Sequence, residues 1–203
     1  MNEKNSIHEF LSKNIEIDLE YFNNDKYFGI LLNKKANLLK LLKLLKEKNE
    51  LLFSQLVDIT AIDYPSREHR FDLIYILLSL KLNKRILIKI PLDENESIES
   101  STQIYKSADW YERECYDLFG IKFVNHPDLR RIMTDYNFEG HPLRKDFPLT
   151  GHNEVRYDEL EKKVIYEEVN LPQEYRNFDY LSPWEGIDNE LIGDKKSDDK
   201  GKA

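Results

Sequence analysis

The sequence predicts a domain in which helices cover a β-sheet of five strands. Five segments have the length and the apolar or alternating pattern of strands, at residues 15–21, 27–32, 53–62, 71–80 and 84–90. Between the second and third segments, leucines recur every three or four residues across 34–50, which predicts an amphipathic helix. A second helix is expected over 108–119, after the last strand.

The N-terminal part is expected to form a short helix and then a hairpin. Ser6 and Glu9 have the spacing of a capping box, and the apolar residues that follow share one helical face. In 15–21, apolar residues alternate with acidic ones, which is typical of a strand with one wet face. The segment 27–32 is expected to pair with it across a turn at 23–25.

The segment 34–50 places leucines on one side and lysines on the other. A basic amphipathic helix can lie on a membrane, but an all-leucine stripe between strands favours packing on the sheet. Later turns are predicted at 64–66 and 82–84, and the polar, acidic segment 91–101 reads as a connection. The segment 71–80 is apolar on both faces, so we expect it to be central in the sheet.

The helix 108–119 is expected to begin at an N-cap, Ser107, and to end at Gly120 in a left-handed conformation. Asp109, Arg113 and Asp117 are spaced four residues apart along it. Residues at this spacing lie on one face, so Arg113 is expected to bridge the two carboxylates.

No long helical or strand period follows residue 120, although 155–158 and 163–169 look like short strands. The chain is therefore divided into a core domain, 1–120, and an extended docking segment with a tail, 121–187. The acidic and lysine-rich end, 188–203, is poor in hydrophobic residues and is expected to be disordered.

Composition excludes several classes of protein. The net charge is −8, and residues 152–203 hold 14 Asp and Glu against eight Lys and Arg, so the acidity is mostly in the tail. Without a basic face, nucleic-acid binding is not expected. The longest apolar run, 73–80, is far shorter than the roughly 20 residues of a spanning helix, and the N-terminus lacks a signal-peptide pattern. Membrane contact is therefore expected only through partners.

No cofactor or catalytic motif emerges from the spacing of reactive residues. His126, Asp128, His141, Asp146 and His152 lie close in sequence, but no pair has the helical spacing of a metal motif. Nucleotide-binding glycine loops are also missing. The single cysteine cannot form an internal disulfide, which favours a reducing compartment; neighbouring carboxylates would raise its pKa, so it reads as a packing residue.

The 31 residues 121–151 instead have the composition of a protein–protein surface. They carry five Lys and Arg, four Asp and Glu, and three prolines that lower the ordering cost of docking. Arginines in such a surface bind partner carboxylates, and Tyr136, Phe138 and Phe147 would serve as aromatic anchors.

At these residues the sequence resembles a known family. The stretches ADWYERECYDLFGI and HPDLRRIMTDYNFEGHPLRKDFPLTG are similar to the signature of the 30-kDa subunit of respiratory complex I, NADH:quinone oxidoreductase, which is the C subunit of the bacterial enzyme. The resemblance continues through LVDITAIDYPSREHRFDLIYILLSL, EVRYDELEKKVIYEEV and YRNFDYLSPWEG, so it covers nearly the whole chain.

The resemblance implies a two-layer α+β domain with a mixed five-stranded sheet covered by helices, and an extended C-terminal tail. It implies a peripheral-arm subunit of a proton-translocating enzyme complex, with no active site of its own. FMN and iron–sulfur clusters are expected in partner subunits. The chain would brace the 49-kDa quinone-site subunit and iron–sulfur subunits, on the cytoplasmic face of a bacterial inner membrane or the matrix side of a mitochondrial one.

The family signature maps onto 18 residues, which the resemblance implies to be structural and interface residues rather than catalytic, cofactor-binding or metal-binding ones. They are Glu112, Arg113, Glu114, Asp117, Gly120, His126, Pro127, Asp128, Arg130, Arg131, Gly140, His141, Pro142, Arg144, Lys145, Asp146, Pro148 and Gly151.

Two other functions stay open at this point. One is the equivalent subunit of a membrane-bound hydrogenase or a ferredoxin-linked relative. The tail sequence YRNFDYLSPWEG favours the respiratory type over this alternative. The other is a free-standing hydrolase that would use His126, His141 and Asp146.

Overall fold

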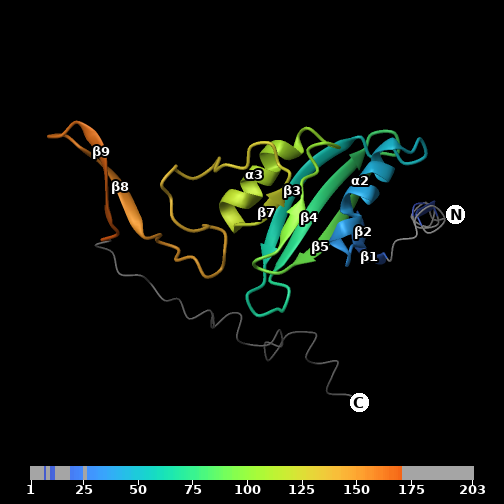
Figure 1. Cartoon of the computed structure of the whole chain (residues 1–203), viewed down its shortest axis with the longest axis horizontal. Coiled ribbons are helices and arrows are strands. Elements are labelled where there is room, and N and C mark those ends of the chain that lie inside the picture. The colour runs from blue at the N-terminus through green and yellow to red at the C-terminus, as the bar shows by residue number, and fades with distance from the viewer. Residues whose placement is uncertain (1–6, 8–9, 12–18, 25–26, 171–203) are drawn as a thin grey trace, which may run out of the picture. The chain divides into compact units, whose positions relative to one another are not determined.

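The computed structural model describes residues 7, 10–11, 19–24 and 27–170 (Figure 1). The chain forms two compact units, Met1–His152 and Asn153–Ala203. Residues 121–152, the first part of the expected docking segment, therefore belong to the same unit as the sheet.

The first unit is built on a mixed five-stranded sheet in the order β1-β2-β5-β4-β3. Neighbouring strands are antiparallel except for β2 and β5, which are parallel. This confirms the expected α+β class and the mixed sheet. β4 is an interior strand, as its apolar sequence predicts, but β5 takes the middle position. The strands are β1 (Glu20–Asn24), β2 (Tyr27–Leu31), β3 (Gln55–Asp63), β4 (Phe71–Ser79) and β5 (Lys84–Leu92).

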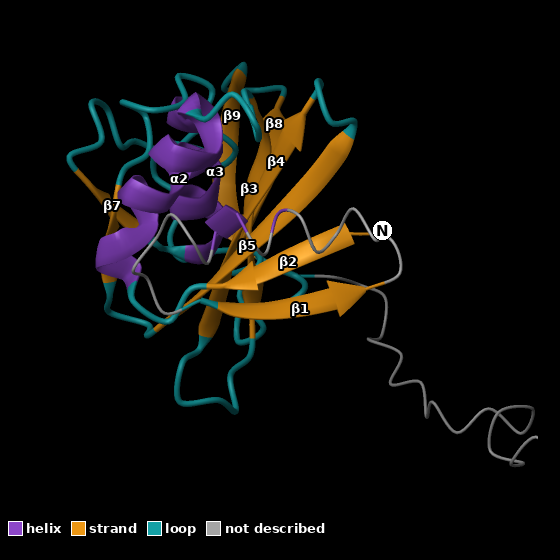
Figure 2. Ribbon diagram, turned by 90° about the vertical axis from the view of Figure 1, so that its right-hand side faces the viewer, coloured by secondary structure: helices purple, strands orange, loops and turns teal. Residues whose placement is uncertain are grey.

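Helices α2 (Leu38–Glu47) and α3 (Ala108–Phe119) cover one face of this sheet (Figure 2). The leucine stripe of α2 is fully buried, so it packs on the sheet rather than on a membrane. The element is shorter than the predicted 34–50, because Lys35–Asn37 form a 3₁₀ turn and the backbone of Lys48 is extended.

The core lies between the helices and the sheet. Ile30, Ile88, Tyr75 and Ile59 stand side by side on four adjacent strands, and each is at most 1% exposed. Tyr105, just before α3, donates its hydroxyl hydrogen to the carbonyl of Phe53 over 2.6 Å. This bond ties the connection that leads into α3 to the start of β3.

The expected N-terminal helix and the first expected strand lie partly outside the described residues. Ser6 and Glu9 of the expected capping box lie outside the described residues, while Ile7 and Leu11 are buried in the core. Residues 15–18 of the first expected strand also lie outside. β1 runs on to Asn24, so the strand continues into the segment expected to turn.

The expectation that 91–101 is only a connection is wrong. β5 continues to Leu92, opposite Phe71 of β4, and Ser97–Glu99 form a short strand, β6, parallel to β7 (Lys122–Val124). Three-residue strands are too short to show a period in the sequence. Their pairing is fixed instead by Ile98 and Phe123, which are buried in the core.

Ser107 stands at the N-cap position of α3 as expected, but it has helical backbone angles and its side chain makes no capping bond. The amides of Ala108 and Asp109 instead donate to the carbonyls of Tyr105 and Lys106. A backbone turn therefore satisfies these amides, and a side-chain cap is not needed.

In the second unit, β8 (Asn153–Asp158) and β9 (Lys163–Glu168) form an antiparallel hairpin, which confirms the two short strands expected there. Arg156 and Glu167 form an ion pair across it. Residues 171–203, including the end expected to be disordered, lie outside the described part of the chain.

Replacing Leu73 by alanine should lower the free energy of unfolding by about 2–5 kcal/mol, because this side chain is fully buried and leaves a cavity. Leu80→Ala is the matched control: its side chain is 70% exposed, so the change should stay within about 0.5 kcal/mol. Urea unfolding followed by circular dichroism measures both. Equal effects at the two positions would contradict the assignment of the core.

Candidate functional site

The signature segment, Glu112–Gly151, closes the C-terminal end of α3. Gly120 ends the helix with a positive φ of 82°, as the sequence predicts. The last helical carbonyls, which lack partners within a helix, then receive donors from residues 141–144. His141 Nδ1 donates to the carbonyl of Asp117 (2.8 Å), and the amide of Leu143 donates to the carbonyl of Leu118 (3.1 Å). Arg144 Nε donates to the carbonyl of Phe119 (2.6 Å).

Gly120 is required here for a second reason. A Cβ atom built at this position would lie 2.5 Å from Arg144 Nη2 and 2.7 Å from the ring of His141. The helix end and the two side chains that close it therefore approach each other too closely for any other residue. Burial lowers the pKa of His141, which favours the neutral ring with its hydrogen on Nδ1.

Asp117 is the centre of this arrangement, because its side chain is fully buried and accepts five hydrogen bonds. The amides of Ile132, Met133 and Thr134 all donate to Oδ2 over 2.7–2.9 Å. Oδ1 accepts from the Thr134 hydroxyl (2.5 Å) and from Arg131 Nη1 (2.7 Å). Burial opposes ionisation, but these donors outweigh it and hold the pKa of Asp117 well below its usual range. One carboxylate thus fixes the backbone of 131–134.

A second buried carboxylate, Asp63 at the end of β3, holds the next part of the segment. Arg70 binds both of its oxygens (2.8 and 3.1 Å), and the amide of Lys145 donates to Oδ2 over 2.7 Å. Burial by itself would raise the pKa of Asp63, but the hydrogen bonds from Arg70 and Lys145 have the larger effect. The pKa of Asp63 is therefore below its usual value. Arg70 also binds Asp146 (2.8 Å) and Glu94 (3.1 Å).

Arg144 joins the same network from the other side. It binds Glu94 over 2.7 Å, and its guanidinium lies over the ring of Phe71, 5.3 Å from the centroid, as does that of Arg70. Arginines of 121–151 are expected from the sequence to bind carboxylates of a partner, but Arg144 binds a carboxylate of its own chain and its side chain is only 17% exposed.

The middle of α3 carries a third buried carboxylate, Glu112. It accepts hydrogen bonds from the hydroxyls of Ser100 (2.6 Å) and Ser101 (2.7 Å) and from the amide of Ser101 (2.7 Å). Burial raises the pKa of Glu112. The fully buried ring of His126 lies 3.2 Å from Asp109 and 3.9 Å from Glu112. This cluster joins α3 to the strands β6 and β7 that precede and follow it.

Arg113 does not bridge Asp109 and Asp117, contrary to expectation. Its guanidinium donates to the carbonyls of Arg130 and Arg131 over 3.2 and 3.1 Å. Asp117 is bound instead by residues 131–134 of the segment, which folds back over the helix, and Asp109 Oδ1 lies 3.2 Å from His126 Nε2.

Several large apolar side chains are exposed on and beside the segment. Trp110 and Met133 are each 65% exposed and Tyr136 is 88% exposed. A surface hollow of about 390 Å³ lies between Trp110 and Tyr136, and arginines including Arg113 line it. Of the other two expected anchors, the rings of Phe138 and Phe147 are partly buried and lie 5.7 Å apart.

The 18 signature residues thus fall into three groups. Two are buried: Glu112 and Asp117. Nine are partly buried as whole residues, although the side chain of His126 is fully buried: Arg113, Glu114, Gly120, His126, Arg131, His141, Pro142, Arg144 and Gly151. Seven are exposed: Pro127, Asp128, Arg130, Gly140, Lys145, Asp146 and Pro148.

Sequence reasoning missed three residues that the site depends on: Asp63, Arg70 and Glu94. All three lie outside the signature segment, and Asp63 is 82 residues away from the amide it binds. One signal was available, because Asp63 ends a strongly apolar strand and Arg70 begins the next across a short turn.

The arrangement does not assemble the hydrolase site considered from the sequence. His126 contacts Asp109, His141 bonds to the carbonyl of Asp117, and Asp146 binds Arg70, so each is engaged separately. Among the described residues, no group of three or more His, Cys, Asp or Glu side chains could hold a metal ion. Cys115 is buried, and burial, with Glu114 and other carboxylates nearby, raises its pKa well above the usual value.

Asp117→Asn should lower the free energy of unfolding by about 3 kcal/mol at pH 7, because Arg131 loses a buried ionic partner. Asp128→Asn is the control. Its carboxylate pairs with Arg130 on the surface and is 56% exposed, so the change should be within about 0.5 kcal/mol.

The pH dependence of the unfolding free energy of wild type and Asp117→Asn gives a second test. The folded pKa of Asp117 is lowered, so its stabilisation is complete above the unfolded value of about 3.9 and is lost as pH falls further. The difference in unfolding free energy between wild type and Asp117→Asn should therefore be constant from pH 7 to 5 and shrink below about pH 4. A difference that grows on acidification would show that the sign is wrong.

Gly120→Ala should destabilise the chain by more than about 1 kcal/mol, because the left-handed backbone alone costs 1–2 kcal/mol for a residue with a Cβ atom. The contacts with Arg144 and His141 add to this cost. Gly120→Ala combined with Arg144→Ala relieves part of the crowding, so the two losses should be less than additive in urea unfolding. Strict additivity would argue against the close approach.

Comparison with solved structures shows the fold. The chain is similar to a chain in the structure of the membrane-bound sulfane sulfur reductase, an archaeal respiratory membrane complex, with a TM-score of 0.61 over 73% of this chain and 87% of the other. The sequence identity is 24%, so this likeness carries no statement about function.

Comparison with known sequences shows the family. Residues 31–153 match the family model described as respiratory-chain NADH dehydrogenase, 30 Kd subunit. Proteins named as the C subunit of NADH-quinone oxidoreductase are similar over most of their length: that of Hyphomonas neptunium is 52% identical, covering 82% of this chain and 83% of the relative. That of Brucella abortus is 56% identical, covering 80% of each. The chain therefore belongs to the 30-kDa subunit family of respiratory-chain NADH dehydrogenase, complex I.

Proposed function

We propose that this chain is a structural subunit of the peripheral arm of a proton-translocating NADH:quinone oxidoreductase. In this role it braces the 49-kDa quinone-site subunit and neighbouring iron–sulfur subunits, and so supports electron transfer from NADH to quinone. FMN and iron–sulfur clusters would be held by those partners. Family membership supports the enzyme complex, and the relatives at 52% and 56% identity are named as its C subunit.

A docking role is supported by the separation of buried, internally bound charges from exposed side chains in and beside the signature segment. Its buried and partly buried charges, such as Asp117, Arg131 and Arg144, are bound within the chain and fix the backbone. Fixing the backbone in advance lowers the entropy lost on association. The exposed side chains of Tyr136, in the segment, and of Trp110, just before it on α3, are then positioned for contact with a partner.

We propose the inner face of the membrane as the location, cytoplasmic in bacteria or on the matrix side in mitochondria. None of the helices that the structure describes is long and apolar enough to cross a bilayer. Attachment would come through the assembled complex. The 18 signature residues are proposed to act as interface and supporting residues, in the division described above.

Native gel electrophoresis of solubilised membranes tests this function directly. An antibody against the chain should detect a band that co-migrates with NADH dehydrogenase activity. Detection of the chain only as a free protein, with the enzyme complex intact elsewhere on the gel, would refute the proposed function.

Tyr136→Ala tests the docking surface. Because this ring is 88% exposed, the isolated chain should keep its unfolding free energy to within about 0.5 kcal/mol. If the ring is an interface anchor, its loss should weaken binding by about 2 kcal/mol, roughly 30-fold. Quantitative immunoblots of the assembled complex measure this, with Leu80→Ala as the exposed control. Normal assembly with reduced turnover would place the residue in the chemistry instead.

A further inference from the structure

The sheet has a second face, which the described helices do not cover (Figure 2). Strand register identifies its residues, because side chains alternate between faces. One row across four strands is Phe22, Gly29, Leu87 and Ile76, and it lies between rows of the core. We call this the open face. It contains Glu20, Phe22, Gly29, Leu31, Gln55, Asp58, Thr60, Ile62, Asp72, Ile74, Ile76, Leu78, Arg85, Leu87, Lys89 and Pro91.

On β4 the open face is more apolar than a face meant for water. An antiparallel sheet with one wet face normally alternates apolar and polar residues. In β4, however, Ile74, Ile76 and Leu78 alternate with the core residues Leu73, Tyr75 and Leu77, so the strand is apolar on both faces. Ile76 and Leu78 are partly exposed. Such a sequence suits a sheet covered on both faces, which indicates that another protein covers the open face in the assembled complex.

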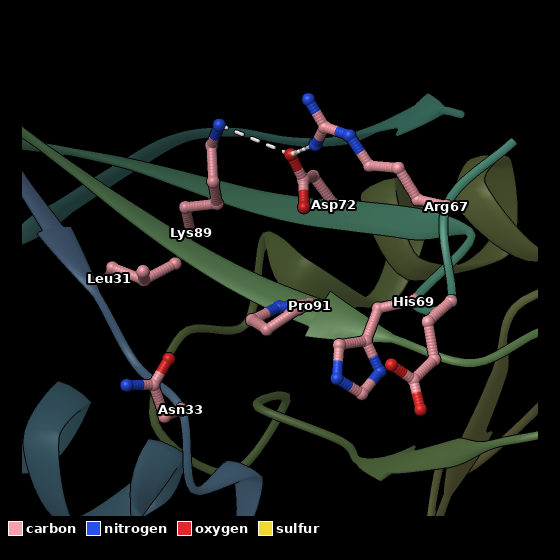
Figure 3. A pocket seen from close by; sticks show the side chains of 8 residues that line it. Leu31, Asn33, Arg67, His69, Asp72, Lys89 and Pro91 are labelled. Carbon is pink, nitrogen blue, oxygen red and sulfur yellow. Dashed lines mark hydrogen bonds and ion pairs between the residues drawn. The ribbon is translucent and has the colours of Figure 1, made fainter.

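One end of the open face carries several charged side chains. Asp72, whose side chain is 7% exposed, is shared by Lys89 Nζ at 3.1 Å and Arg67 Nη1 at 3.4 Å (Figure 3). Two cations thus have one carboxylate between them. The guanidinium of Arg67 lies over the ring of Tyr64, 3.6 Å from its centroid, and the side chain is 53% exposed.

These charges line a hollow of about 430 Å³, whose wall also includes Leu31 and Pro91 (Figure 3). His69 and Glu68 line it too. The hydrogen bond to Asp93 raises the pKa of His69. The hollow therefore has apolar walls beside a guanidinium that stacks on Tyr64 and makes a long contact, 3.4 Å, with Asp72.

We propose that the open face is a second docking surface, which binds an amphipathic segment of another subunit of the complex. The segment lays apolar side chains along Ile76, Leu78 and Leu87 and places a carboxylate in the hollow beside Arg67 and Lys89. This inference rests on the proposed function, because it requires an assembly. It adds a surface distinct from the signature segment.

The location of the surface can be measured by cysteine labelling in the whole complex. The chain has one native cysteine, Cys115, which is 1% exposed and should react slowly. Leu87→Cys introduces a thiol on the open face, and Leu80→Cys introduces one in the turn after β4, where the native side chain is 70% exposed. A maleimide should label Leu87→Cys at least tenfold more slowly in the complex than in the free chain, while Leu80→Cys changes less than twofold. Equal rates for Leu87→Cys in both states would overturn the proposal.

The occupant is identified by cross-linking from the same thiol. A thiol-linked photoreactive probe on Leu87→Cys, activated in the purified complex, should join the chain to another subunit at an apolar segment that contains Asp or Glu. A cross-link to a second copy of this chain, or within the chain to its own residues 171–203, would overturn the proposed occupant.

The charge requirement has its own matched pair. Arg67→Glu should reduce the amount of assembled complex at least tenfold and lower the salt concentration at which it dissociates. Lys40→Glu makes the same change on the exposed side of α2 and should have no effect. If Arg67→Glu leaves the amount and the salt stability of the complex unchanged, the proposed contact between Arg67 and a partner carboxylate is refuted. If wild type fails to co-migrate with NADH dehydrogenase activity, the proposed function fails; if it co-migrates but the open face stays reactive, only this inference fails.

Discussion

The described fold of the signature segment depends on one buried carboxylate. Asp117 ionises inside the protein because three consecutive amides, a hydroxyl and Arg131 donate to it, which compensates for the water it loses. A stretch with no regular secondary structure has few backbone partners of its own. The carboxylate supplies them for residues 132–134, and the end of α3 accepts donors from 141–144. Irregular backbone thereby becomes a fixed surface.

This explains why the segment is dense in charge without being an active site. Burying an unpaired charge is costly, so each buried acid needs several donors, and each arginine in turn is bound to more than one acceptor. Asp63, Arg70, Glu94 and Arg144 form a network of this kind. Titratable groups with shifted pKa values often mark catalysis, but structural networks shift them too. Here the low pKa of Asp117 reflects its role in holding the chain.

The two proposed docking surfaces differ in what holds their side chains in place. The signature segment presents exposed aromatic rings on a backbone held by buried ions. The open face presents half-buried aliphatic side chains on a rigid sheet, with Arg67 at one end. With both proposed surfaces in use, the chain contacts two neighbours at once, which fits the proposed bracing role.

The sequence by itself determined the element types, the mixed charge of the signature segment and, through its motifs, the family. Local rules sufficed for α2, for β3 to β5 and for the left-handed Gly120, since these depend on periodicity and on one residue's backbone freedom. Only the tertiary structure decided where each charge goes: Arg113 binds carbonyls rather than its helical neighbours, and Asp63 meets the amide of Lys145. Hydrogen-bond partners are set by which segments the topology brings within about 3 Å, and sequence spacing cannot supply that for residues 82 positions apart.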